Sequence, residues 1–161
     1  MDSLISLLSP SLAIVGWGIA YRLAKVNSTR TESKSLIDSC NTLIDTLAEK
    51  GSEFYLSPTS TKGQQRNFEK YALNKISLLF KKLELLDKRG VTTKQEMISD
   101  FHMALTKGIP THGLKQEEDD NCAHKIMSES AKISYNLHSQ FHVKYPPIEG
   151  FISFKRYFWK H

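Results

Sequence analysis

The chain is poor in cysteine, with only Cys40 and Cys122 among 161 residues and no Cys-x-x-Cys pair. Small secreted domains held together by disulfides need a much denser set of cysteines, so that class is excluded. A structural zinc site built on cysteine pairs is excluded for the same reason. We therefore expect two free thiols in a reducing compartment.

Charge is absent over residues 3–21, and this run ends on Arg22 and Lys25. At about 1.5 Å of rise per residue, a helix of this length reaches roughly 28 Å, close to the hydrocarbon thickness of a bilayer. The alternatives are a cleaved signal peptide, which would start with basic residues rather than Asp2, and a helix buried in a soluble core. The run predicts a transmembrane anchor over residues 1–24.

Lysine and arginine follow the uncharged run, and none precedes it. Cytoplasmic flanks of a span carry the excess of basic residues, so residues 25–161 are expected in the cytosol. About 135 residues suffice for one hydrophobic core but not for two. The formal charge of +5 and the pI near 9.1 fit an anionic membrane surface or a nucleic acid, and the total does not distinguish them.

Small side chains recur within the expected span at intervals of three and four residues, at Ser6, Ser9, Ala13, Gly16 and Ala20. This spacing places them on one helical face. Because apolar burial does not drive helices together inside a bilayer, close backbone approach along small residues is a usual mode of association. The small-residue stripe therefore predicts a homo-oligomer, although small residues are also common in short spans.

Apolar residues keep helical spacing through the rest of the chain. We expect the anchor helix to continue to Phe54, followed by a loop over 57–65 and a helix over 67–88 that is closed by Arg89-Gly90. The next helix should start with a capping box at Thr93 and Glu96 and end at Gly108. A loop over 108–115 and a helix over 119–145 should follow. No strand-like alternation of useful length occurs. The predicted fold is all-α, a single N-terminal transmembrane helix that continues into a cytosolic helical bundle.

Five histidines lie in the second half of the chain before the tail, and His138 and His142 are four residues apart. Two histidines at this spacing on a helix can bind zinc. The zinc-protease motif also needs a glutamate next to the first histidine, which is missing here. We expect a solvated or packed histidine pair, with neither a metal nor a cofactor.

The last segment, residues 151–161, contains five aromatic rings among three basic side chains. Such a segment can stack on RNA bases, lie at a membrane surface or pack in a subunit interface. Its composition favours packing in the core or in an interface over RNA contact. RNA binding stays open.

Within this segment, four residues separate Arg156 from His161. The spacing resembles the Arg-x4–6-His motif of HEPN ribonucleases, all-α proteins in which two motifs meet across a dimer. Together with the N-terminal span and the helical domain, it makes the chain resemble the small membrane-anchored accessory proteins of type VI-B CRISPR systems, which carry a divergent HEPN motif. The resemblance implies a cytosolic HEPN-like bundle over residues 25–161, attached to the bacterial inner membrane by the single span. It also implies an oligomeric pore that depolarises the cell and thereby enhances antiviral defence by an RNA-guided, RNA-targeting effector.

Two other functions stay open beside this non-enzymatic pore. In a membrane-tethered ribonuclease dimer, His161 would act as general acid and base and Arg156 would stabilise the developing charge. Because five residues subtend about 500° on an ideal helix, the two side chains would lie some 140° apart and would need a second subunit to converge. They can instead make polar contacts between subunits. The third function is a scaffold that recruits a partner through the loops at 57–65 and 108–115.

Overall fold

The computed structural model describes residues 2–57, 62–106 and 116–146, with side chains from residue 12 onward except those of residues 62 and 116. These ranges contain four α-helices and no strand, which confirms the all-α prediction for this part of the chain. The helices are α1 (Asp2–Leu56), α2 (Lys62–Asp87), α3 (Gln95–Thr106) and α4 (Gln116–Lys144). The chain forms two compact units, Met1–Ser35 and Leu36–His161.

Helix α1 runs without a break from the expected anchor into the second unit, as predicted. Its middle is rich in serine and threonine, which favour caps and turns over helix interiors. Here the hydroxyls of Thr29, Thr31 and Ser33 donate to the carbonyl oxygens of Lys25, Asn27 and Thr29, at 2.9, 3.0 and 2.7 Å. Each hydroxyl shares the carbonyl oxygen that also accepts the helical backbone bond, an arrangement that keeps the helix but slightly destabilises it.

Among the described residues, no helix contains a stretch that is both long and apolar enough to cross a bilayer. The expected anchor over residues 1–24 gains no support from this finding and stays a prediction. The side chains of its residues 2–11 lie outside the described part of the chain.

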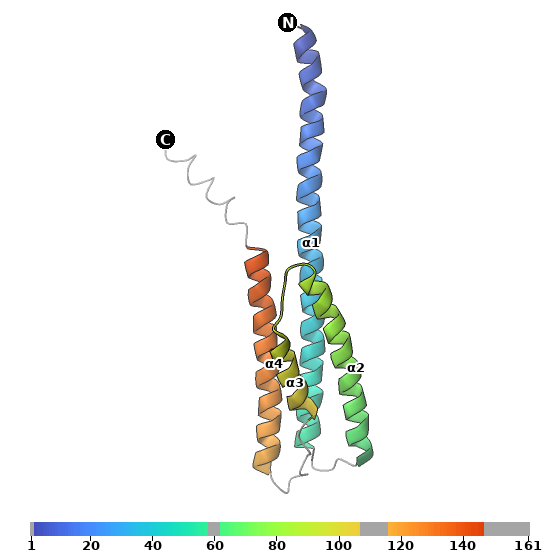
Figure 1. Ribbon diagram of the computed structural model, residues 1–161, viewed down its shortest axis with the longest axis vertical. Coiled ribbons are helices and arrows are strands. Elements are labelled where there is room, and N and C mark those ends of the chain that lie inside the picture. Colours follow the sequence, from blue (N-terminus) through green and yellow to red (C-terminus); the bar gives the residue numbers. More distant parts are fainter. Residues whose placement is uncertain (1, 58–61, 107–115, 147–161) are drawn as a thin grey trace, which may run out of the picture. The chain divides into compact units, whose positions relative to one another are not determined.

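The second unit is a helical bundle made by residues 36–56 of α1 together with α2, α3 and α4. Successive helices alternate in direction, and α3 is the short member (Figure 1). The core is formed by apolar side chains that recur every three or four residues on the inner face of each helix. They are Ile37, Cys40, Ile44, Leu47, Ala48, Tyr55, Ala72, Ile76, Leu79, Leu83, Leu86, Val91, Ile98, Phe101, Ala104, Leu105, Ile126, Ile133, Leu137 and Phe141.

At Gly51 the backbone of α1 lies close to side chains of α3 and α4. A Cβ atom at this position would lie 2.6 Å from Leu105 Cδ2 and 3.2 Å from Ile126 Cδ1. Glycine lowers helix propensity by about 1 kcal/mol relative to alanine, so its presence inside α1 needs a packing reason. The missing side chain is that reason, because it lets Leu105 and Ile126 pack directly against the α1 backbone.

Helix α2 ends as the sequence predicts, at Arg89-Gly90. Gly90 has a φ of +81°, the Gly90 amide donates to the Asp87 carbonyl at 2.8 Å, and the Val91 amide donates to the Leu86 carbonyl at 3.0 Å. This pair of bonds is a Schellman motif, closed by contact between apolar residues on either side of the glycine. Both Leu86 and Val91 are fully buried, so the turn is anchored in the core.

The starts of the helices differ from the prediction. Helix α2 begins at Lys62 and α4 at Gln116, before the expected positions 67 and 119. Their first turns contain no large apolar residue, so apolar periodicity could not reveal them. The expected loop over 57–65 is correspondingly shorter. The loop expected over 108–115 lies entirely outside the described residues, and so does Gly108, the expected end of α3.

The predicted capping box at the start of α3 is wrong. The helix begins at Gln95, and the Met97 amide donates to the Lys94 carbonyl at 3.1 Å. The Thr93 hydroxyl is buried and makes no hydrogen bond within the described part of the chain. The physical reason is that Lys94, not Thr93, directly precedes the helix, so the Thr93 hydroxyl lies one residue too early to cap the first turn.

Candidate functional site

Apolar side chains on α1 within the first unit are strongly exposed. Leu12, Ile14, Val15, Trp17, Ile19, Tyr21, Leu23 and Val26 are each more than half exposed, and Trp17 reaches 82%. Contiguous apolar surfaces of this size mark interaction with a membrane, a ligand or another protein. This exposed apolar surface of α1 is the candidate functional site.

The small-residue stripe occupies one side of the same segment. Ala13, Gly16 and Ala20 are exposed, and the helical register places Ser6 and Ser9 on the same face. The side chains of the two serines lie outside the described residues. A Cβ atom at Gly16 would meet nothing within 4 Å, and the same is true of Gly18 on the opposite side. The stripe therefore has room for a neighbouring helix.

Charged side chains begin near the C-terminal end of this surface, whose last members are Leu23 and Val26. Arg22 and Lys25 are exposed on the turns that follow Tyr21. One turn further, the Ser28 hydroxyl donates to a carboxylate oxygen of Glu32 at 3.0 Å. Amphipathic rings and basic side chains in this order are typical of a helix that leaves a bilayer at the headgroup level.

No family model, no curated protein and no solved structure matches the chain. The candidate HEPN residues Arg156 and His161 lie outside the described residues, as does the whole aromatic segment over 151–161. The function therefore has to be argued from the described helices and from the sequence.

His138 links two helices of the bundle. The Asn41 side-chain amide donates to His138 Nε2 at 3.0 Å, which joins α1 to α4 when the ring proton is on Nδ1. Four residues on, the His142 ring packs edge to face on Phe141, with 5.8 Å between the ring centroids. Among the described residues, no group of three histidine, cysteine or acidic side chains could hold a metal ion. His138 thus has a packing role.

Cys40 and Cys122 are free thiols, as predicted. Burial raises the pKa of Cys40 to about 11, against a smaller opposite effect of Lys82. Burial also raises the pKa of Cys122, with further contributions from the carboxylates of Asp119 and Glu118. Neither thiol is activated, because a reactive cysteine needs a lowered pKa.

We expect iodoacetamide at pH 8 to modify Cys122 at least about tenfold faster than Cys40 in the folded protein, because only thiolates react and Cys40 is buried. In urea the two rates should converge, as peptide mass spectrometry can show. The pKa of Cys40 is raised above its ordinary value of 9.0, so the stability that Cys40 contributes is complete below pH 9 and is lost as the pH rises towards 11. Cys40→Ala should remove that pH dependence. Equal rates of iodoacetamide modification of Cys40 and Cys122 in the folded protein would contradict the burial of Cys40.

Sequence reasoning missed the outer face of α2. Between its core positions the helix carries a second stripe at three- and four-residue spacing, and every member is exposed: Asn67, Lys70, Asn74, Leu78, Lys81, Leu85 and Lys88. The signal was the same periodicity that reveals the core, shifted to the opposite face. Leu78 and Leu85 add apolar surface among the lysines of this face.

Proposed function

We propose that this chain is a subunit of a membrane-anchored homo-oligomer that forms a pore and depolarises the cell. The observation that carries this proposal is the exposed apolar surface of α1 over residues 12–26. It overlaps the uncharged run over residues 3–21, and Arg22 and Lys25 lie near its C-terminal end. A bilayer would cover the apolar side chains and place the basic ones among lipid headgroups.

The exposed apolar surface of α1 consists of eight large side chains. Burying one such side chain is worth about 1.5–3 kcal/mol, so their joint exposure to water would cost on the order of 10 kcal/mol or more. An acyl-chain environment removes that cost. Because apolar burial no longer distinguishes one helix from another inside lipid, small residues decide which faces meet.

The small-residue stripe supports self-association. Ala13, Gly16 and Ala20 leave one side of α1 without bulky groups, and the space beyond Gly16 is open. Neighbouring copies can approach closely along this side. The hydroxyls of Ser3, Ser6, Ser9 and Ser11 are the polar groups of the expected span, so a pore wall would include small apolar residues.

The biological setting of the proposal rests on the resemblance to type VI-B CRISPR accessory proteins. We propose that the chain is anchored in the bacterial inner membrane, with a HEPN-like domain over residues 25–161 in the cytosol. We also propose a functional link to an RNA-guided, RNA-targeting effector. We assign Arg156 and His161 to polar contacts between subunits. About 140° would separate the two side chains on one helix, so they would need a second subunit to converge. Catalysis by the pair is an outcome that the experiment below tests.

The first experiment is the mass of the full-length protein in detergent, corrected for bound detergent, together with potassium efflux from vesicles that contain it. A closed ring of many subunits with efflux supports the pore. A dimer without efflux favours the ribonuclease site at Arg156 and His161, and RNA cleavage that is lost in His161→Ala would establish it. A monomer without efflux contradicts both functions.

A further inference from the structure

The outer stripe of α2 is basic and apolar at once. Leu78 and Leu85 are 41% and 49% exposed and lie seven residues apart, with Lys81 between them. Lys70 extends the stripe towards the start of the helix. Lys88 extends it towards the end and binds Glu84 through its Nζ atom, 2.8 Å from Oε1. Both groups of this pair are well exposed, so it holds Lys88 only weakly.

A face of opposite charge lies on α1 within the bundle. Asp38, Asp45, Glu49 and Glu53 are all exposed and recur at intervals of seven, four and four residues, which places them on one side of the helix. Asn41 and Ser52, on the flank next to this side, bond to α4 through His138 Nε2 and the Ala123 carbonyl. The acidic stripe therefore runs beside α4.

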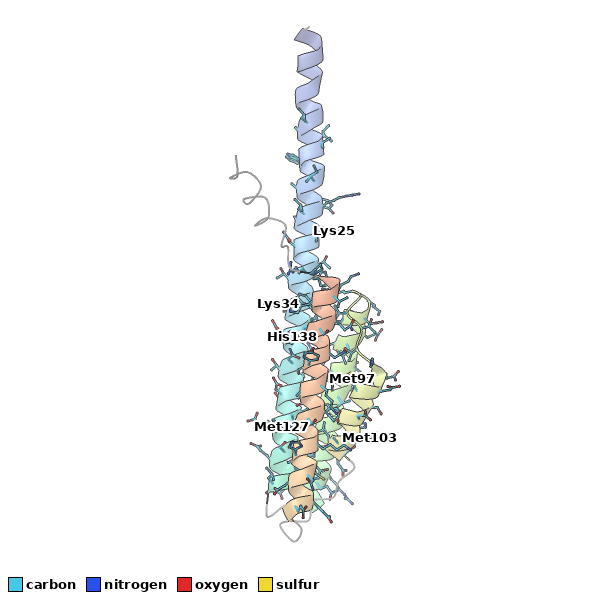
Figure 2. All side chains as sticks on the ribbon, turned by 90° about the vertical axis from the view of Figure 1, so that its left-hand side faces the viewer. Lys25, Lys34, Met97, Met103, Met127 and His138 are labelled. Carbon is cyan, nitrogen blue, oxygen red and sulfur yellow. The ribbon has the colours of Figure 1, made fainter. Side chains whose placement is uncertain are left out.

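The adjoining outer face of α4 is almost uncharged and partly apolar. His124, Met127, Ala131, Tyr135 and His138 are exposed at helical spacing, and Met127 and Tyr135 are 52% and 77% exposed. Figure 2 shows α4 beside the lower part of α1, with Met127 and His138 along it. Apolar side chains next to a row of carboxylates mirror the leucines and lysines of α2.

Charge is separated within the bundle to an unusual degree. Residues 66–89 hold seven basic and three acidic side chains, whereas residues 36–56 of α1 hold four acidic and one basic. Charge of opposite sign on different faces favours head-to-tail contact between copies and opposes face-to-face contact of like faces. A lipid surface or a nucleic acid would use the basic face alone and leave the acidic face without a role.

We propose that the outer stripe of α2 of one copy docks on the acidic stripe of α1 and the adjoining outer face of α4 of the next copy. Leu78 and Leu85 are about 10.5 Å apart along α2, and Met127 and Tyr135 are about 12 Å apart along α4, so the two apolar pairs have nearly matching spacing. The same seven-residue interval separates Lys81 from Lys88 and Asp38 from Asp45. Such a heterologous contact generates a ring when its rotation closes.

This inference rests on the proposed function for self-assembly, and it adds the interface between the cytosolic domains. The test uses the full-length protein in detergent and measures the concentration at which the assembly half-dissociates. Lys70→Glu/Lys81→Glu reverses charge on α2, and Asp45→Lys/Glu49→Lys reverses it on α1. Each double variant should raise the half-dissociation concentration by at least about tenfold, because like charges then face each other across the contact.

The decisive variant combines both reversals, since it restores opposite charges across the interface and should return the half-dissociation concentration to within about threefold of the original. Lys94→Glu/Lys125→Glu is the matched control for the α2 reversal. It lowers the net charge by the same amount as Lys70→Glu/Lys81→Glu, but at exposed positions outside both faces. Circular dichroism melting shows whether each variant folds. The combined variant keeps the test informative if one reversal alone unfolds the bundle.

The outcomes separate the two proposals. A monomeric original protein would overturn the proposed function and this interface together. An assembly that resists both reversals would overturn the interface and leave the pore in place. If Lys70→Glu/Lys81→Glu reduces binding to vesicles of anionic lipid while the assembly is unchanged, the α2 stripe faces lipid and the interface is wrong.

Discussion

Leucine at both Ala13 and Gly16 should abolish assembly and ion efflux. Both positions are exposed, and nothing in the described part of the chain lies within 4 Å of a Cβ at Gly16, so the subunit itself can accommodate the larger side chains. A neighbouring helix packed along the small-residue stripe cannot, because close backbone approach depends on small residues. Detergent-corrected mass and potassium efflux from vesicles both report the loss.

Gly18→Leu is the matched control for this double variant. Gly18 also has open space beyond its Cβ position, but it lies on the opposite side of α1. It should therefore leave the mass and the efflux unchanged. Particles of unaltered mass after Ala13→Leu/Gly16→Leu would refute the role of the stripe, and equal damage from Gly18→Leu would point to a general effect of bulk in the membrane.

Phe101→Ala should lower the free energy of unfolding of the bundle by about 3–5 kcal/mol, the usual cost of deleting a buried aromatic side chain. Phe101 is fully buried on α3, the shortest helix, whose other core residues are Ile98, Ala104 and Leu105. With so few anchors, a cavity at Phe101 removes much of what holds α3 in place. Urea unfolding of the full-length protein in detergent, followed by far-ultraviolet circular dichroism, measures the loss.

Met103→Ala provides the comparison on the same helix. Met103 is 42% exposed, so its truncation should cost less than about 1 kcal/mol. Equal losses from the two variants would mean that α3 does not pack as the structure places it. A loss confined to Phe101→Ala supports the core, and the mass in detergent then shows whether assembly depends on the bundle.

Much of the fold is predictable from periodicity alone. The apolar face expected on α2 reappears as the buried residues Ala72, Ile76, Leu79 and Leu83, with Phe68 partly buried at its edge. The glycine stop at Gly90 is also found, because a left-handed residue after a helix is a local requirement. These features depend on neighbours within one helix, which a single sequence displays.

Other features escaped prediction because they depend on contacts between distant segments. Gly51 looks unfavourable inside a helix until Leu105 and Ile126 are seen to approach its backbone. The capping box at Thr93 failed because Lys94, and not Thr93, directly precedes the first residue of α3. Of the candidate site, the sequence revealed the small-residue stripe but not the open space along it.

The sequence by itself determined the helical class, the faces that are buried and the uncharged run that begins the chain, since each follows from the order of apolar and charged residues. Only the tertiary structure decided which helices are neighbours and therefore which exposed stripes adjoin. The acidic stripe of α1 lies beside the apolar face of α4 because Asn41 and Ser52 bond across that boundary. Periodicity assigns residues to the faces of one helix, whereas the placement of one face beside another depends on packing across the whole bundle.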